Sequence, residues 1–260
     1  YGAEVAFSTA GCTPAEGEFL YSDNGGSWII NEEGARIWFS SGASPDIEVS
    51  AGLIYLHKEH EIDVYTREGV FQRSVTVYPL IDYPFVLILL PGEEFAFLDN
   101  SNDLVSFTDR NGTLKEVVSI TGRPADGILQ NVDGVVVENH LIISEDNERN
   151  LIAINLDTYE RSVFKSLGEQ LTGWMGDIDY SDGLFYLVQS RKVHVFTRER
   201  EAELLCELPE GNNTGIAVHE DFAYVTSNFG NKIYRINIRN GTYSVLVDDA
   251  DNPRDIELFP

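Results

Sequence analysis

The sequence predicts an all-β fold, a six-bladed β-propeller built from four-stranded blades. Short segments alternate apolar and polar residues, turns rich in Gly, Asn and Asp separate them, and this pattern recurs along the chain. The apolar residues that open successive units lie about 38–49 residues apart, which is the spacing of propeller blades. These residues are Ile47, Val86, Val135, Ile178, Ile216 and Ile256. We therefore expect a single domain over residues 1–260.

Each complete unit is expected to contain an apolar inner strand, a second strand rich in aromatic residues, a third strand and a valine-rich outer strand. Unit one, over residues 19–41, supplies only three of these strands (FLYSDN, GSWIIN and ARIWFSS). The other units open with PDIEVS, PFVLIL, DGVVVE, GDIDYS and TGIAVH. No segment shows a helical period.

The incomplete first unit predicts how the ring closes. A last apolar strand, RDIELF, lies at residues 254–259 with no unit after it. We expect residues 253–259 to become the innermost strand of the first blade, which ties the two ends of the chain together. The triplet Asp255-Ile256-Glu257 repeats Asp46-Ile47-Glu48, which favours this strand over the competing segment 3–8. Residues 1–17 would then form an extra strand or a plug.

Charge and composition exclude some classes of partner. The chain carries 43 acidic and 18 basic residues, for a net charge of −25. Nucleic acid needs a cationic face, so no nucleic-acid partner is expected. No apolar run is long enough to insert into a membrane. The acidity suits a solvated surface, cation attraction or life in high salt.

The start of the chain and its cysteines bear on location. The chain begins at Tyr1 without Met, so both a removed signal peptide and a trimmed chain stay open, and we expect an extracytoplasmic protein, secreted or at the cell surface. Cys12 and Cys206 are too few for a disulfide scaffold, although one bridge between them stays open. Cys206 lies in an apolar strand and is expected to be a buried thiol.

Polar residues at the starts of the inner strands are the main candidate site. In a propeller these positions face one mouth of the central channel, where converging carboxylates repel one another unless a cation or protons neutralise them. Oxygen ligands of this kind suit calcium or another divalent cation. The predicted metal ligands are Asp46, Asp133, Asp177, Asn213 and Asp255. The predicted ligand-binding residues beside them are Asp82, Asp126 and Arg254.

Histidine chemistry finds less support. His57 and His60 in the stretch HKEH flank a hairpin turn, and we expect solvent-exposed turn residues there rather than a metal pair. There is no G-x-S-x-G motif, and no nucleotide or organic cofactor is indicated.

A family resemblance rests on the last unit. The stretch TGIAVHEDFAYVTSNFGNKIYRINIRNGT resembles the repeats of NHL-like and YVTN-like propellers and of the gluconolactonase (regucalcin-like) and strictosidine-synthase-like propellers; DGVVVENHLIISEDNERNLIAINLDT is similar to the same pattern. The resemblance to gluconolactonases implies a calcium site of Glu, Asn and Asp at the channel mouth. Asp126-Gly127-Ile128 resembles their P-D-G element, whereas their E-G-P-x-W opening is absent and residues 16–19 are the nearest stretch.

Two functions follow as hypotheses. The first is a binding, recognition or scaffold protein that takes a small molecule, glycan or protein at a channel mouth. The alternative is a divalent-metal-dependent lactone hydrolase that uses the channel carboxylates. Loss of metal binding on replacing Asp177 and Asp255 would be needed to keep the second.

Overall fold

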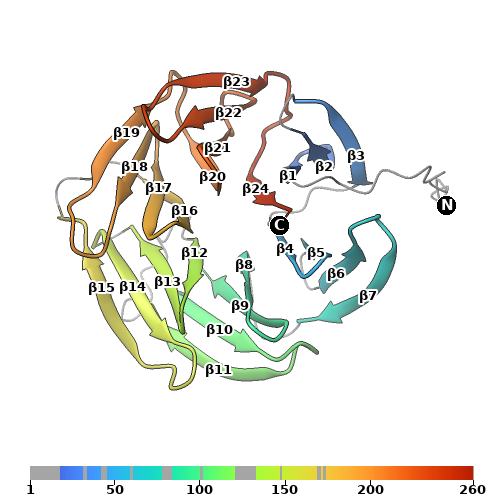
Figure 1. Cartoon of the computed structure of the whole chain (residues 1–260). Helices are drawn as coiled ribbons and strands as arrows, with labels where there is room; N and C mark the ends of the chain where they lie inside the picture. Colours follow the sequence, from blue (N-terminus) through green and yellow to red (C-terminus); the bar gives the residue numbers. More distant parts are fainter. Residues whose placement is uncertain are drawn as a thin grey trace.

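The computed structural model shows a ring of six four-stranded antiparallel sheets around a central axis (Figure 1). It describes residues 18–31, 34–41, 46–58, 61–77, 84–99, 102–120, 133–146, 148–168, 171 and 174–259. The predicted six-bladed propeller is confirmed. The described part of the chain contains no helix long and apolar enough to cross a bilayer.

Blades one to three are arranged from the axis outward in the same order. Blade one contains β24 (Asp255–Leu258), β1 (Phe19–Asp23), β2 (Gly26–Ile30) and β3 (Arg36–Ser41). Blade two contains β4 (Ile47–Ser50), β5 (Leu53–Lys58), β6 (Glu61–Thr66) and β7 (Phe71–Thr76). Blade three contains β8 (Pro84–Leu90), β9 (Glu94–Asp99), β10 (Leu104–Thr108) and β11 (Leu114–Ser119).

Blades four to six repeat this order. Blade four contains β12 (Gly134–Val137), β13 (His140–Glu145), β14 (Asn150–Asn155) and β15 (Arg161–Ser166). Blade five contains β16 (Met175–Ser181), β17 (Leu184–Gln189), β18 (Lys192–Phe196) and β19 (Glu203–Glu207). Blade six contains β20 (Asn213–His219), β21 (Phe222–Ser227), β22 (Lys232–Asn237) and β23 (Tyr243–Val247).

The C-terminal strand closes the ring as the sequence predicts. β24 pairs antiparallel with β1, with Ile256 opposite Tyr21 and Asp255 opposite Ser22. The place beside β1 is therefore filled by the end of the chain. The competing segment 3–8 lies outside the described residues, as does the expected extra strand or plug in residues 1–17.

The hydrophobic core is divided among the blade interfaces. Each interface between neighbouring blades has its own cluster of buried side chains, so the ring holds six clusters. Between blades one and two, for example, Leu20 and Phe259 pack with Ile47 and Leu56. The two faces of each sheet are therefore both buried, and the inner strands are left to line the channel.

Cys206 and His57 are both buried, which agrees with the prediction for the cysteine and disagrees with that for the histidine. Cys206 is buried in β19 and has a free thiol, as expected, whereas Cys12 lies outside the described residues. The expectation of an exposed His57 is wrong, because its side chain is fully buried in β5. β5 extends one residue past His57 before the turn, and the imidazole packs near the ring of Phe97 in the next blade. His60 is outside the described residues.

Candidate metal centre in the central channel

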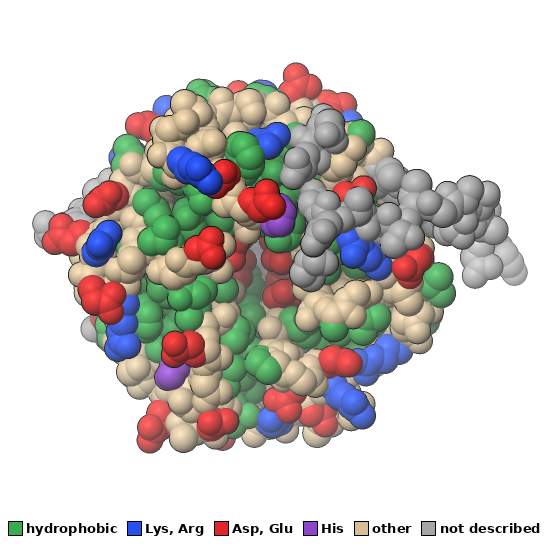
Figure 2. All heavy atoms as spheres, viewed as in Figure 1, with side chains coloured by type: hydrophobic (Ala, Val, Ile, Leu, Met, Phe, Trp, Pro, Cys, Tyr) green, Lys and Arg blue, Asp and Glu red, His purple; other side chains and the backbone are tan. Residues whose placement is uncertain are grey.

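The central channel contains a cavity of about 330 Å³ whose polar lining is acidic. The inner strands of the blades form its wall, and Figure 2 shows acidic side chains around the opening on the axis. Seven carboxylates line it: Asp46, Glu48, Asp133, Asp177, Asp179, Asp255 and Glu257. Among the described residues, no Lys, Arg or His side chain lines this cavity. Its negative charge therefore has no counter-charge within the wall.

The carboxylates form two layers along the channel. Side chains two residues apart on a strand point to the same side, about 6.7 Å apart along the strand. The first layer lies near the mouth where the inner strands begin, and the second layer lies deeper, toward the mouth where they end. The first layer comprises Asp46, Asp133, Asp177 and Asp255; the second comprises Glu48, Asp179 and Glu257.

The second layer was missed in the sequence analysis. Its signal was present in the repeated triplets Asp46-Ile47-Glu48, Asp177-Ile178-Asp179 and Asp255-Ile256-Glu257. The repeat of these triplets favoured residues 253–259 as the closing strand, but only the first acidic residue of each was assigned to a site. Because alternate residues of a strand share one side, the third residue of each triplet faces the channel as well.

Most first-layer carboxylates join neighbouring blades. Asp255 Oδ2 accepts a hydrogen bond from the Ile47 backbone N–H at 2.9 Å, and Asp177 Oδ2 accepts one from Ile216 at 2.6 Å. Asp46 likewise accepts from the Leu87 N–H. An inner strand has one edge with no sheet partner, so its N–H groups need acceptors. The carboxylates of the preceding blade supply them.

We call this row of hydrogen bonds between blades the seam. Two second-layer carboxylates extend the seam by two residues along the same strands. Glu48 Oε1 accepts from the Leu89 N–H at 3.0 Å, and Asp179 Oδ2 accepts from the Val218 N–H at 2.6 Å. Between the first-layer and the second-layer bond, the residue number increases by two on both strands. Neighbouring inner strands therefore run parallel. The seam is therefore a structural use of the carboxylates that does not need a metal.

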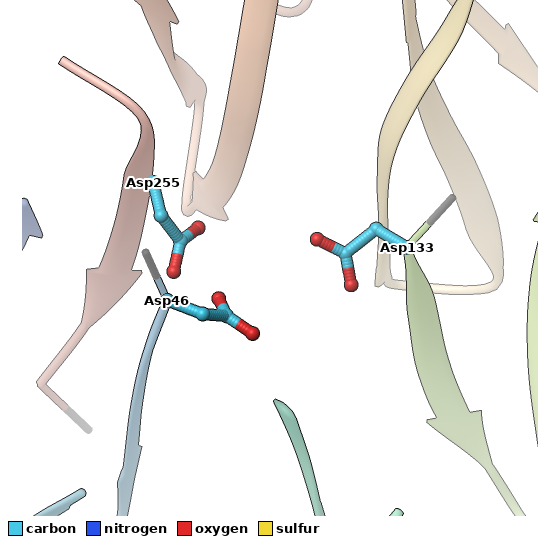
Figure 3. A group of neighbouring side chains, drawn as sticks. All are labelled: Asp46, Asp133 and Asp255. Carbon is cyan, nitrogen blue, oxygen red and sulfur yellow. The ribbon is translucent and has the colours of Figure 1, made fainter. Parts of the chain in front are cut away.

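Asp133 differs from the other first-layer residues. Its Oδ1 accepts only from the next residue in the chain, Gly134, at 2.7 Å, and no inter-blade N–H donates to it among the described residues. Figure 3 shows its carboxylate facing those of Asp46 and Asp255 across the channel. The three side chains each offer an oxygen within 4.8 Å of the others. Among the described residues, Asp133 is thus the first-layer carboxylate that accepts no backbone hydrogen bond from a neighbouring blade.

Burial and mutual repulsion make these carboxylates hold protons tightly. Burial is the largest cause that raises the pKa of Asp46 well above its usual value, followed by the charge of Asp255. Burial likewise raises the pKa of Asp133, with Asp255 the next cause, and the pKa of Asp177, with Asp133 the next cause. In the second layer burial raises the pKa of Glu48 and of Glu257. The channel therefore has to be neutralised by protons or by a cation.

The group of three fits a calcium ion. Calcium binds six to eight oxygen ligands at about 2.3–2.6 Å, so two of its ligands lie at most about 5 Å apart. The oxygens of Asp46, Asp133 and Asp255, within 4.8 Å of one another, meet this limit. Carbonyl oxygens or water would complete the shell.

The remaining predicted site residues lie elsewhere. Asn213 was aligned with the first layer, but Asn213 pairs with Ser227 in blade six as Met175 pairs with Gln189 in blade five, so Asn213 is the equivalent of Met175. Gly215, directly before Ile216, is the equivalent of Asp177, directly before Ile178. Gly215 occupies that place because a Cβ there would lie 2.9 Å from the Asp255 Cα. Asn213 is buried but does not line the cavity, and neither amide atom has a described hydrogen-bond partner.

Arg254 does not line the channel cavity. Its guanidinium Nη2 lies 3.4 Å from Asn24 Oδ1, on the rim of blade one. Asp82 and Asp126, the other two predicted ligand-binding residues, lie outside the described residues.

Comparison with known proteins supports the fold. No protein-family model matches the sequence, and no curated protein matches it. Among solved structures, a chain of a nidogen–laminin complex is similar over 92% of this chain and 97% of that one, with a TM-score of 0.74 and 12% identity. A proposed 6-phosphogluconolactonase from Bacteroides uniformis is similar over 94% of this chain and 100% of that one, with a TM-score of 0.66 and 13% identity.

A third similar structure is the virginiamycin B lyase of Staphylococcus aureus, in an inactive variant with quinupristin. The similarity covers 81% of this chain and 72% of the lyase chain, with a TM-score of 0.61 and 16% identity. At these identities the likeness concerns the fold alone, and the same fold is found in binding proteins and in enzymes.

Proposed function

We propose that this protein is a cation-binding recognition propeller, in which a divalent cation of the calcium class binds in the channel and a ligand binds at a channel mouth. Asp46, Asp133 and Asp255 are the proposed ligands of the cation. The observation that supports this most is the set of seven carboxylates in one cavity with no described basic side chain among them. A bound cation would replace the protons that those groups otherwise need.

The cation is proposed to hold the ring rigid. Asp255 belongs to blade one, Asp46 to blade two and Asp133 to blade four, so one ion would connect three blades around the axis. A rigid ring presents its loops in fixed positions, which suits recognition. We also propose that the protein acts outside the cytoplasm, where many protein modules bind calcium only weakly.

Calorimetric titration of the metal-free protein with calcium at constant ionic strength tests the proposal. The expected result is saturable binding that weakens at least tenfold in the Asp133→Asn variant, since Asn removes the charge and keeps the size. Asp182→Asn is the matched control, because Asp182 is exposed in a turn outside the cavity. Absence of saturable binding to the wild-type protein would refute the cation site.

A lactone hydrolase is the second candidate, favoured by the room beside the carboxylates. A cavity of about 330 Å³ is at the lower end of small-molecule sites, so a small substrate would fit next to an ion. The ion would polarise the lactone carbonyl, and a channel carboxylate would orient the attacking water. Calcium-dependent hydrolysis of gluconolactone that is lost in Asp133→Asn would support this function; equal rates with calcium and with EDTA would exclude it.

A further inference from the structure

A second cavity, of about 610 Å³, opens beside the channel mouth where the inner strands end. It lies between blades two and three and shares Glu48, Leu89 and Val136 with the channel cavity. We call it the mouth groove. Its size is within the range of small-molecule sites.

Two tight turns form the walls of the mouth groove. One carries Ala51 and Gly52, with φ of 49° and 77°, and the other carries Gly92 and Glu93, with φ of 82° and 61°. Left-handed residues at both central positions are typical of tight hairpin turns, whose backbone is well defined. The groove therefore has a preformed shape.

The mouth groove has an acidic group at one end and a basic group at the other. At the inner end lies Glu48, next to the other channel carboxylates. At the outer end lies Arg110, whose guanidinium forms no ion pair with a described residue. The Arg110 carbonyl accepts a hydrogen bond from Arg73 Nη1 at 2.9 Å, which fixes its turn against blade two. The other acid of the groove, Glu93, is neutralised by Arg73 Nη2 at 3.0 Å.

Tyr55 provides a polar group without a partner between these ends. Its side chain is fully buried and lines the groove, and its hydroxyl has no hydrogen-bond partner among the described residues. A buried hydroxyl without a hydrogen-bond partner is unfavourable, so a ligand that supplied an acceptor atom for it would bind more tightly. Ser50 at the end of β4 adds a second hydroxyl to the lining.

We propose that the mouth groove binds a short zwitterionic peptide or a free amino acid, with its ammonium group toward Glu48 and its carboxylate toward Arg110. A purely anionic ligand would meet the channel carboxylates, and a purely cationic ligand would leave Arg110 unpaired. A zwitterion complements both ends, and its carbonyl oxygen would accept from Tyr55. The inference rests on the proposed recognition role of the channel mouth and names its ligand class.

Amide NMR spectra of the protein titrated with triglycine test the inference. We expect saturable shifts at the amides of residues 50–52 and of Gly92 and Glu93. Acetylated triglycine lacks the ammonium group and triglycinamide lacks the carboxylate, so each should bind roughly tenfold more weakly. No saturable shift with triglycine, or equal binding of all three probes, would overturn the proposal.

Matched variants assign the contacts. Arg110→Gln should weaken triglycine binding by roughly tenfold and Tyr55→Phe several-fold. Arg200→Gln changes an exposed arginine in the corresponding turn of blade five, and Tyr186→Phe changes the tyrosine that faces Asp179 as Tyr55 faces Glu48. Both controls should bind as the wild-type protein does. Equal losses in Arg110→Gln and Arg200→Gln would refute the groove as the site.

The test is separable from that of the cation. Arg110 and Tyr55 are absent from the lining of the channel cavity, so their variants should bind calcium normally. Triglycine binding without calcium binding would refute only the cation site, and calcium binding without triglycine binding would refute only the mouth groove.

Discussion

Asp177 of blade five accepts a hydrogen bond from the backbone N–H of Ile216 in blade six, at 2.6 Å. The same carboxylate accepts from the Ile178 N–H at 2.5 Å, so both of its oxygens bond to backbone. The Asp133 carboxylate, one blade earlier, accepts from a single described backbone N–H, that of the adjacent Gly134. The two aspartates occupy equivalent positions in the repeats of blades four and five but have different roles. Asp177 joins two blades, and Asp133 faces the proposed cation.

We predict that Asp177→Ala destabilises the protein more than Asp133→Ala does. Removing the Asp177 carboxylate leaves two N–H groups without acceptors, at a cost of about 1–3 kcal/mol for each buried group. Urea unfolding near pH 5, where carboxylate repulsion is small, measures the difference. Calcium affinity should show the opposite order, with the larger loss in Asp133→Ala. The same order in both measurements would contradict this division of roles.

Calcium should raise the thermal stability of the protein. A ligand that binds only the folded state adds about 2.7 kcal/mol at one hundred times its Kd. For a chain of this length that corresponds to a rise in Tm of about 5–10 °C. Differential scanning calorimetry with calcium and with EDTA, at fixed ionic strength, measures it. A rise that depends on monovalent salt alone would instead assign the acidity to a solvated surface.

Without calcium, stability should fall as the pH rises above about 4. The channel carboxyls have ordinary pKa values of 3.8 for Asp and 4.5 for Glu, and burial raises the pKa of Asp46 and Glu48 well above these. Between the ordinary and the raised pKa the folded chain binds more protons than the unfolded chain. Their contribution to stability is therefore complete below the ordinary pKa and is lost as the pH rises through the raised pKa.

Two buried histidines act in the opposite direction and have to be separated. Burial lowers the pKa of His57 and of His194 to about 4, so each costs stability as the pH falls from 6.5 toward 4. The gain in Tm from calcium at each pH isolates the channel, because the histidine contribution is common to both samples. This gain should increase with pH in the wild-type protein and be smaller in Asp133→Asn. A gain independent of pH would contradict a cation bound by these carboxyls.

Gly215→Ala should destabilise the junction of blades six and one. The added Cβ would lie 2.9 Å from the Asp255 Cα and 3.0 Å from the Ile256 nitrogen, which are backbone atoms that cannot move alone. Overpacking of this kind costs about 1–3 kcal/mol, or a fall in Tm of roughly 2–12 °C. Gly211→Ala is the control, since its Cβ would meet only the flexible Arg191 side chain at 3.2 Å. Equal Tm values for the two variants would show that the junction is not tightly packed.

The fold could be read from local patterns because each blade is a local structure. Strands such as β5 and β9 are successive segments joined by short turns, and their alternation of apolar and polar residues is visible in the sequence. The closure by β24 was also predictable. The first unit lacks one strand and the chain ends with one strand that belongs to no unit, so the last strand completes the first blade.

The candidate site was only partly predictable. The aspartates at the starts of inner strands were identified, but Asn213 was aligned to a place that Gly215 occupies. The alignment of Ile178 with Ile216 already puts Gly215 at that place, and a glycine has no side chain to mark it as part of a site. The fully buried position of His57 was missed because it depends on packing against the next blade, which the sequence of its own hairpin does not show.

The sequence by itself determined the number of blades, the order of strands and the acidic character of the channel, since these follow from periodicity and composition. The tertiary structure alone decided which carboxylates join blades, which face one another and where the mouth groove opens. Those properties depend on distances between side chains some forty or more residues apart, such as Asp46 and Asp133, which only the closed ring brings together.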